Sequence, residues 1–343
     1  MKLTNFIGNE KVIDRLSKLM ESGRFPHALI IEGEEGIGKK TLAKDIACAL
    51  VCRGDDKPCG ECSQCKKAIG AIHPDISEYV PAGIFSLIHP DISEYIPAGT
   101  ANSFHVDTVR NIINDAYVQP NEADYKIYIL ANAHCMNQNA QNALLKILEE
   151  PPKYVVFILT TNSKSALLST VLSRSVCVSL EGVDIERAAN YITSHCENVD
   201  YNTAKKTVET FNGNIGKAID SLQDSKTSEL VDVCNKICKA LATSNEYEMM
   251  TLCSVFQKDR QGVVFACDLL KSIFRDALFA GESSEHISGQ EESAALLKSS
   301  LSRQSLIKLI NTCDELKSTA LSNANNALLI TKFCYSLNRA IGR

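Results

Sequence analysis

The sequence contains no Trp, and Gly and Pro are both scarce. Its 17 Gly and 9 Pro are about 5% and 3% of the 343 residues, below the usual ~7% and ~5%, which predicts long helices with few tight turns. Apolar residues make up 45% and charged residues 22%, so disordered, collagen-like and low-complexity classes are excluded. At roughly 150 residues per domain, the length predicts two to three folded domains.

An excess of positive charge is also missing. Lys and Arg number 36 against 41 Asp and Glu, so the net charge of −5 is unlike that of a protein that binds nucleic acid unaided. No run approaches the ~18 apolar residues that span a bilayer, and the start of the chain lacks a signal-peptide pattern. We therefore expect a cytoplasmic protein with no membrane partner. Most of the 14 Cys lie singly in apolar helical contexts, which indicates buried thiols rather than a disulfide framework.

Short β-branched runs alternate with helical patterns in the first half of the chain, which predicts a parallel sheet covered by helices. The expected strands are 28–32, 76–80 or its copy, 127–130, 155–160 and 176–180, and the expected helices are 10–22, 39–52, 106–117 and 139–150. Beyond residue 182 the strand pattern disappears. We predict an α/β domain over 1–182, a small helical domain over 183–223 and a second all-helical domain over 224–343.

One segment occurs twice. Residues 72–83 recur as 88–99, an offset of 16 residues, with only Val80 changed, to Ile96. Two copies are too few and too short for a solenoid, so we interpret them as a tandem duplication inside one domain. One strand position accepts one copy, and we expect the other to form a loop or an added edge strand.

Residues 33–41, Gly-Glu-Glu-Gly-Ile-Gly-Lys-Lys-Thr, follow an expected strand and begin an expected helix, the context of a phosphate-binding P-loop. Gly33, Gly36, Gly38 and Lys39 are its candidate nucleotide-binding residues. The position after Lys39 requires Ser or Thr to hold Mg²⁺, but it is Lys40. We therefore expect no Mg²⁺ site, and the loop either binds nucleotide or serves only as a helix-capping turn.

The expected strand 127–130 also lacks the carboxylates of an ATPase. A hydrolytic P-loop protein needs one acid for Mg²⁺ and one to activate water at this point, yet the chain continues with Ala131 and Asn132. Two independent defects predict that this chain does not hydrolyse ATP by itself.

Four cysteines form a compact pattern at residues 52–65. Cys52, Cys59, Cys62 and Cys65 lie in a polar segment at the short spacing of a closed tetrahedral Zn²⁺ site, with an iron–sulfur cluster or free thiols as the alternatives. Four protein ligands leave no position for water, so the expected role is structural. Cys48 is interpreted as a core residue. The histidines show no metal-ligand spacing and no nucleophile–base pair, so none is assigned chemistry.

Several segments together resemble the clamp-loader subunits of bacterial DNA polymerase III, within the AAA+ superfamily. They are 7–9 (Ile-Gly-Asn), 23–28, the loop 33–41, the four-Cys insertion, 139–152 (Asn-Ala-Gln-Asn-Ala-Leu-Leu-Lys-Ile-Leu-Glu-Glu-Pro-Pro), 160–162 (Thr-Thr-Asn) and 173–175 (Ser-Arg-Ser). The resemblance implies an AAA+ α/β domain with a zinc-binding insertion, a small helical lid domain and a helical collar that joins subunits into a ring. The duplicated segment departs from the family pattern.

Within that family the tau/gamma subunits hydrolyse ATP, whereas delta-prime subunits have lost the catalytic groups. The defects at Lys40 and at Ala131-Asn132 therefore favour the delta-prime branch, and an active tau/gamma-type ATPase is the alternative. The resemblance implies that Arg174 acts as an arginine finger in the ATP site of a neighbouring subunit. The implied partners are the tau/gamma and delta subunits, and indirectly the sliding clamp and primer-template DNA. The charge of −5 disfavours a third hypothesis, a stand-alone zinc and nucleic-acid-binding module.

Overall fold

The structure is a computed structural model that describes residues 6–80, 104, 106–196, 199–223, 225–243, 245–279, 288–321 and 325–342. The chain divides into two compact units, Met1–Gly182 and Val183–Arg343, called the first and second unit below. Among the described residues, no helix combines the length and the apolar character that crossing a membrane requires.

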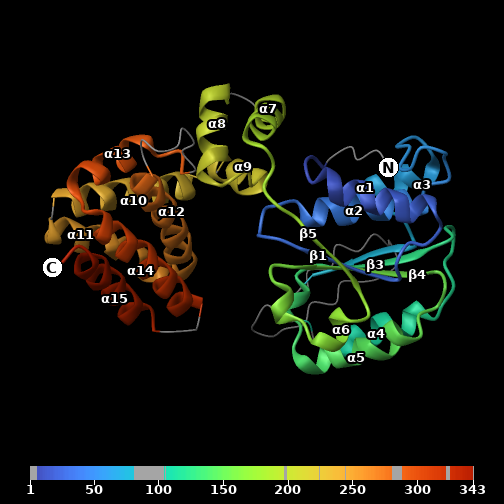
Figure 1. Ribbon diagram of the computed structural model, residues 1–343. Coiled ribbons are helices and arrows are strands. Elements are labelled where there is room, and N and C mark those ends of the chain that lie inside the picture. Colours follow the sequence, from blue (N-terminus) through green and yellow to red (C-terminus); the bar gives the residue numbers. More distant parts are fainter. Residues whose placement is uncertain are drawn as a thin grey trace. The chain divides into compact units, whose positions relative to one another are not determined.

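The first unit is built on a five-stranded sheet (Figure 1). Its strands are β1 (Ala28–Glu32), β2 (Ile76–Tyr79), β3 (Lys126–Leu130), β4 (Val155–Thr161) and β5 (Val176–Ser179). They lie in the order β2-β3-β4-β1-β5, and every neighbouring pair is parallel. All five carboxyl ends therefore lie at one edge of the sheet, which is the edge where α/β proteins bind ligands.

Helices cover both faces of this sheet. In Figure 1, α1 (Glu10–Glu21), α2 (Lys39–Val51) and α3 (Ser63–Ile69) lie on one side of the strands, and α4 (Val106–Ala116), α5 (Gln138–Glu149) and α6 (Ser169–Leu172) lie on the other. Two short 3₁₀ helices, η1 (Ala133–Cys135) and η2 (Lys164–Ala166), follow β3 and β4.

Alternation along the strands separates two hydrophobic cores. In β1, Leu29 and Ile31 pack in the core that contains α1 and α2, whereas Ala28 and Ile30 pack in the core that contains α4 and α5. Each of these four side chains is fully buried. A strand buried on both faces has a continuous apolar sequence, as parallel sheets require.

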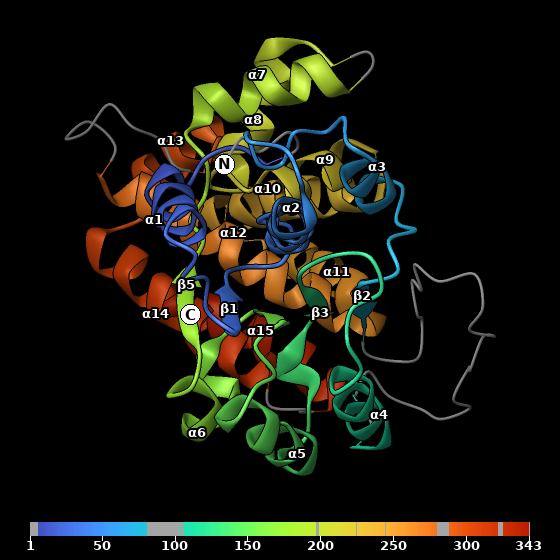
Figure 2. The ribbon, with the colours of Figure 1, turned by 90° about the vertical axis from the view of Figure 1, so that its right-hand side faces the viewer.

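The described part of the second unit is helical and contains no strand. Its helices are α7 (Ile185–His195), α8 (Tyr201–Thr210), α9 (Ile215–Gln223), α10 (Ser225–Thr243), α11 (Glu246–Ser254), α12 (Arg260–Phe279), α13 (Glu291–Ser300), α14 (Arg303–Leu321) and α15 (Asn326–Ala340), with a 3₁₀ helix, η3 (Val255–Lys258). Figure 2 shows α12 among the other helices of this unit. A single apolar cluster from Leu230 to Ala340 forms its largest core.

The predicted fold class, a parallel α/β domain followed by an all-helical region, is confirmed by this architecture. Within the repeat, the first copy supplies β2, an edge strand that pairs with β3. The second copy, 88–99, lies outside the described residues, and so does the expected displacement of one copy. The division of the second unit at residues 223 and 224 stays a prediction.

Candidate functional site

The predicted P-loop connects β1 to α2 at the carboxyl edge of the sheet. Gly36 and Gly38 adopt positive φ angles of 82° and 94°, which a β-carbon would strain. A Cβ on Gly38 would also lie 3.0 Å from the ring of Phe6, a side chain that is itself buried. Both glycines are therefore required by the shape of the loop.

Lys39 points back into the loop that precedes it. Its Nζ donates to the carbonyl oxygens of Gly33 at 2.7 Å and Glu34 at 2.6 Å, and to Oδ1 of Asn162 at 2.9 Å. Only 7% of the residue is exposed. These uncharged oxygens solvate the buried ammonium group through charge-assisted hydrogen bonds.

Lys40, at the position where Mg²⁺ binding needs a hydroxyl, contacts an acid on β2. Its Nζ lies 2.7 Å from Oε1 of Glu78, and Lys44 Nζ lies 3.1 Å from Oε2. The Glu78 side chain is 1% exposed. A buried carboxylate needs a cation, because removing one partner of such a pair leaves an uncompensated charge. Lys40 therefore has a structural role that sequence inspection did not identify.

The end of β3 lies beside the loop, without an acid. Ala131 is buried, and Asn132 adopts a left-handed conformation with φ 55°, its N–H donating to Thr160 Oγ1 at 3.0 Å. His134 follows on η1, where its Nδ1 accepts from the Asn162 N–H at 3.4 Å. Burial, reinforced by the charge of Lys39, lowers the pKa of His134 below its usual value. Ala131 and Asn132 carry no carboxylate, so neither of them can bind Mg²⁺ as an acid or take a proton from water.

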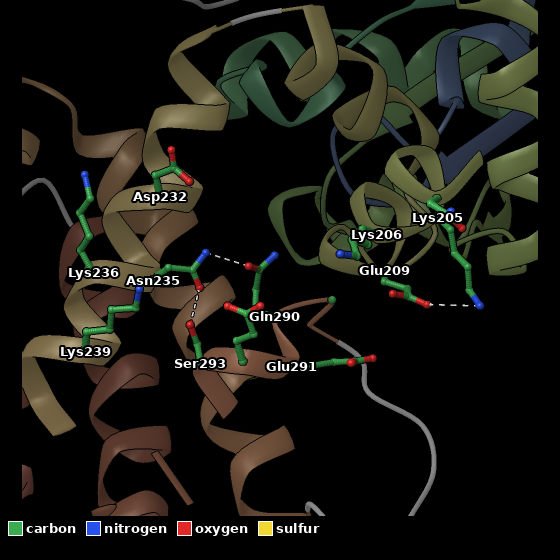
Figure 3. Close-up of a pocket in the computed structure, with 13 residues that line it drawn as sticks. Lys205, Lys206, Glu209, Asp232, Asn235, Lys236, Lys239, Gln290, Glu291 and Ser293 are labelled. Carbon is green, nitrogen blue, oxygen red and sulfur yellow. Dashed lines mark hydrogen bonds and ion pairs between the residues drawn. The ribbon is translucent and has the colours of Figure 1, made fainter. Parts of the chain in front are cut away.

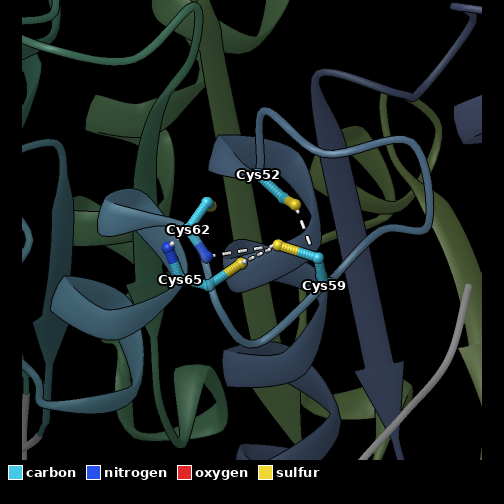
Figure 4. A group of neighbouring side chains, drawn as sticks. All are labelled: Cys52, Cys59, Cys62 and Cys65. Atoms are coloured by element: carbon cyan, nitrogen blue, oxygen red, sulfur yellow. Dashed lines mark hydrogen bonds between the residues drawn. The ribbon is translucent and has the colours of Figure 1, made fainter.

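The four predicted cysteines come together between α2 and α3 (Figure 4). The Sγ atoms of Cys52, Cys59, Cys62 and Cys65 all lie within 4.8 Å of one another, and those of Cys59 and Cys65 are 3.9 Å apart. Tetrahedral zinc with Zn–S bonds of about 2.3 Å places its sulfurs ~3.8 Å apart. The arrangement is one that could hold a metal ion such as zinc.

Backbone N–H groups are directed at these sulfurs. Cys52 Sγ accepts from Gly54 at 3.3 Å and from Cys59 at 3.4 Å, and Cys62 Sγ accepts from Cys65 at 3.4 Å. Backbone hydrogen bonds lower the pKa of Cys59. For Cys62, backbone and thiol hydrogen bonds together outweigh burial and lower the pKa to about 6, whereas burial raises the pKa of Cys65. Such bonds stabilise thiolates, the form that ligates metal. Cys48, as predicted, is a buried thiol, and burial raises its pKa to about 11.

Two buried polar residues of the repeat attach this module to the sheet. His73 Nε2 lies 2.6 Å from Gln64 Oε1 on α3, and His73 Nδ1 accepts from the Asp75 N–H at 3.1 Å. The Asp75 carboxylate accepts three backbone N–H groups, from Asn121 at 2.6 Å, Glu122 at 2.7 Å and Ala123 at 2.8 Å. Sequence reasoning missed these anchors, although an identical His-Pro-Asp in both copies was a usable signal.

Arg174 follows α6 and is partly exposed. Its side chain is 35% exposed and lies 2.7 Å from Oε1 of Glu149, the last residue of α5. The guanidinium also donates to the Thr170 carbonyl at 3.0 Å and to Ser173 Oγ at 3.3 Å. Arg174 thus lies on the surface of the first unit, paired with an acid of the same unit.

A pocket in the second unit was not predicted from the sequence (Figure 3). Its volume is about 840 Å³, and it is lined by α8, α10 and the start of α13. Its charged lining residues are four lysines and four acids, Lys205, Lys206, Lys236, Lys239, Glu209, Asp232, Glu291 and Glu292. Asn235 donates to Gln290 Oε1 at 2.7 Å and accepts from the Ser293 hydroxyl at 2.7 Å. The balanced charge gives no preference for a ligand of either sign.

The chain is similar to subunits of a DNA polymerase. The family model for the DNA polymerase III delta subunit matches residues 8–184. The DNA polymerase III gamma subunit of Buchnera aphidicola (subspecies Acyrthosiphon pisum) is 24% identical over 277 residues, which cover 78% of this chain and 72% of that protein. The DNA polymerase III tau subunit of Escherichia coli K12 is 29% identical over 183 residues, which cover 53% of this chain and 26% of that protein.

Among solved structures, a DNA polymerase III gamma subunit-related protein from Thermotoga maritima aligns with 95% of this chain and 100% of its own. Its sequence identity is 15% and the TM-score is 0.42, so the assignment rests on the sequence family instead. The family model spans just over half of the chain and covers the sheet, the P-loop, the cysteine cluster and Arg174. The chain belongs to the DNA polymerase III delta subunit family.

Proposed function

We propose that this protein is a clamp-loader subunit of DNA polymerase III of the delta-prime type. It does not hydrolyse ATP itself, and it supplies Arg174 in trans to a neighbouring ATPase subunit during loading of the sliding clamp onto primed DNA. The observation that carries the proposal is that Lys40, at the Mg²⁺ position, pairs with the buried Glu78, while β3 is followed by Ala131 and Asn132, where an ATPase has acids.

The groups around the loop support the absence of hydrolysis. The residue at the Mg²⁺ position, Lys40, is paired with a buried carboxylate, and the end of β3 offers Ala131 and Asn132 in place of two acids. Phosphoryl transfer from ATP depends on Mg²⁺ and on an oriented water. Lys40 cannot bind Mg²⁺, and neither Ala131 nor Asn132 can act as a base for the water. Binding of nucleotide would also require Lys39 to exchange three oxygen partners for phosphate oxygens.

The surroundings of Arg174 support a role in trans. Its only charged contact of those described, with Glu149, joins two partly exposed side chains, at 35% and 50%. Exposed pairs of this kind contribute about 0–1 kcal/mol. A phosphoryl group carrying more negative charge would displace the carboxylate, so the pair does not prevent Arg174 from reaching a neighbouring subunit's nucleotide.

The proposed partners follow from the family. The matched relatives are gamma and tau subunits of DNA polymerase III, which supports the tau/gamma and delta subunits as direct partners. The sliding clamp and primer-template DNA are proposed as indirect partners, because a chain with net charge −5 binds DNA poorly without help. The cysteine cluster is proposed to hold structural Zn²⁺, which as a closed four-thiolate site would stabilise the loop between α2 and α3.

The alternative is an active ATPase of the tau/gamma type. Its support is that the matched relatives carry those names. A functional site would require Lys39 to release its loop and another acid to replace the missing pair.

The two functions are distinguished by Mg²⁺-dependent ATP hydrolysis, measured for the purified chain alone and then mixed with a P-loop-competent gamma or tau subunit, the delta subunit, clamp and primed DNA. We expect no turnover by the lone chain and a DNA-stimulated rate in the mixture. Arg174→Ala should lower that rate by at least 100-fold while the complex still assembles. The control Arg110→Ala, an exposed arginine on α4, should keep the wild-type rate. Turnover by the lone chain that falls in Lys39→Ala would establish the ATPase instead.

A further inference from the structure

Both terminal nitrogens of the Arg174 guanidinium have partners within the first unit. Nη2 lies 2.7 Å from Glu149 Oε1, and Nη1 donates to the Thr170 carbonyl at 3.0 Å and to Ser173 Oγ at 3.3 Å. A guanidinium binds a phosphate through the same planar fork of N–H groups with which it binds a carboxylate. A phosphate that approaches the terminal nitrogens of Arg174 therefore competes with Glu149.

Glu149 is the last residue of α5, where a negative charge does not favour the helix. The carbonyl groups at a helix C-terminus carry partial negative charge, so cations are stabilising there and acids are not. Arg174, which follows α6, places its guanidinium beside this acid. The ion pair thus offsets a charge that α5 by itself would disfavour.

The backbone of Glu149 is held in place at the end of α5. The N–H of Glu150, the next residue, donates to the Lys146 carbonyl at 3.2 Å, so helical geometry extends through Glu149. Pro151 and Pro152 then end the helix, and a proline restricts the backbone of the residue before it. The Glu149 carboxylate is therefore presented from a fixed point of the fold.

A buried glutamine joins α5 to the segment that leads to Arg174. Gln141 on α5 is 3% exposed, donates to the Ala166 carbonyl at 3.2 Å and accepts from the Leu168 N–H at 2.7 Å. Leu168 directly precedes α6, and Val171 of α6 lies in the same apolar core as the buried side chains of α5. Figures 1 and 2 both show α5 and α6 side by side. The packing of two helices therefore brings Arg174 to Glu149.

We propose that Glu149 is a positioning residue that holds Arg174 in a cis-bound conformation and so restrains hydrolysis by the neighbouring subunit until primed DNA is bound. This inference rests on the proposed function of Arg174 in trans. In the second, engaged conformation Arg174 leaves Glu149, and its guanidinium contacts phosphate oxygens of a nucleoside triphosphate in the neighbouring subunit.

The exposure of the pair sets the size of the restraint. The side chains of Arg174 and Glu149 are 35% and 50% exposed. Ion pairs of this exposure change an equilibrium constant by at most about fivefold. The pair is therefore strong enough to lower the population of the engaged conformation and weak enough for a bound nucleotide to displace it.

The equilibrium between the two conformations determines where the restraint is visible. Where the engaged conformation is the minor one, as we infer without DNA, its population rises in proportion when the cis-bound conformation is weakened. Where the engaged conformation already predominates, as we infer with primed DNA, the same change adds little. Glu149 should therefore lower the unstimulated rate of ATP hydrolysis and increase the stimulation by DNA.

ATP hydrolysis by the complete complex tests this, measured with and without primed DNA in the presence of a P-loop-competent gamma or tau subunit, the delta subunit and the clamp. Glu149→Gln keeps the size of the side chain and removes its charge. It should raise the unstimulated rate about two- to fivefold and change the DNA-stimulated rate by less than about 1.5-fold. Glu150→Gln is the matched control, since Glu150 is the adjacent exposed acid and has no described contact with Arg174. It should leave both rates unchanged.

The Arg174→Ala background shows whether Glu149 acts through the arginine. Glu149→Gln should change neither rate there, because no guanidinium remains to be released. The inference is overturned if Glu149→Gln lowers the unstimulated rate or leaves it unchanged, or if the rate rises equally in the Arg174→Ala background. Those outcomes leave the role of Arg174 in trans intact. A DNA-stimulated rate that does not respond to Arg174→Ala overturns the proposed function itself, and this inference with it.

Discussion

At the scale of single residues, Lys39 joins the P-loop to the end of β4. Its ammonium group has three described oxygen partners from the loop and from β4's end, and the residue is nearly fully buried. Gly36 and Gly38 keep the loop in the conformation typical of a P-loop, and the ammonium group of Lys39 is hydrogen-bonded to the carbonyl oxygens of Gly33 and Glu34 in that loop. The described contacts of Lys39 therefore contribute to the stability of the loop.

Lys39→Met should lower the free energy of unfolding by about 1–3 kcal/mol, because the carbonyl oxygens of Gly33 and Glu34 would lose a charged donor. Urea denaturation followed by circular dichroism measures this change. Lys18→Met is the control, since Lys18 is 71% exposed and only pairs with Asp14 one turn away. Equal losses in the two variants would contradict the structural role of Lys39.

His134 gives the first unit a dependence on pH. Burial and the charge of Lys39 lower its pKa in the folded state below the ordinary ~6.5 of an unfolded chain. As the pH falls, His134 is therefore protonated in the unfolded state before it is protonated in the folded state. Its contribution to the free energy of unfolding is complete above pH ~6.5 and is lost as the pH falls below that value. Between pH 7.5 and pH 5.5 the Tm should fall less in His134→Asn than in the wild type. Between pH 7.5 and pH 8.5 the two proteins should change in parallel, and a difference there would argue against His134.

Sequence reasoning identified the residues of these sites but not their contacts. Lys40 was recognised as unable to bind Mg²⁺, yet its partner Glu78 lies on another strand, 38 positions along the chain. The pairing of Arg174 with Glu149 was equally hidden, because it depends on how α5 and α6 pack. Motifs report which residue types are present, whereas contacts between distant segments are set by the fold.

At the scale of elements, each expected strand and long helix of the first unit agrees with the structure to within one residue at either end. The apolar runs of β1, β3 and β4 are buried on both faces, and Pro151 and Pro152 end α5 where expected. Two α-helices of this unit were missed, α3 and α6. They have seven and four residues, too few for a helical period to appear in the sequence.

The loop that contains Cys52, Cys59, Cys62 and α3 has almost no apolar core apart from its own thiols. We predict that replacing Cys59 and Cys62 with Ser abolishes zinc binding and lowers the Tm of the first unit by about 5 °C or more, since each kcal/mol corresponds to ~2–4 °C at this size. Zinc content measured by mass spectrometry and thermal unfolding check the two effects separately.

Cys48→Ala is the matched variant for that experiment. Cys48 is 5% exposed and lies against the cluster, but it is not among the four sulfurs within 4.8 Å. It should keep a full equivalent of zinc while losing some stability from the cavity. Loss of zinc in Cys48→Ala, or an unchanged Tm in the double Ser variant, would contradict the assignment of the ligands.

At the scale of the whole molecule, the two units have separate cores. The apolar clusters on the two faces of the sheet draw only on residues 6–180, and the helical cluster draws only on residues 230–341. Each unit exceeds 150 residues, enough to bury most of its surface without the other. The boundary was visible in the sequence because β-branched runs stop where the helical unit begins.

We therefore expect two unfolding transitions in the full chain, of which one responds to zinc. A chelator should lower the transition of the first unit and leave that of the second unchanged, because all four candidate ligands lie in Met1–Gly182. Calorimetry of the full chain, compared with a fragment of residues 183–343, assigns each transition. The fragment should unfold cooperatively within a few degrees of the zinc-independent transition, because its core includes no residue of the first unit. A fragment without a cooperative transition, or a chelator effect on both transitions, would show that the units fold as one.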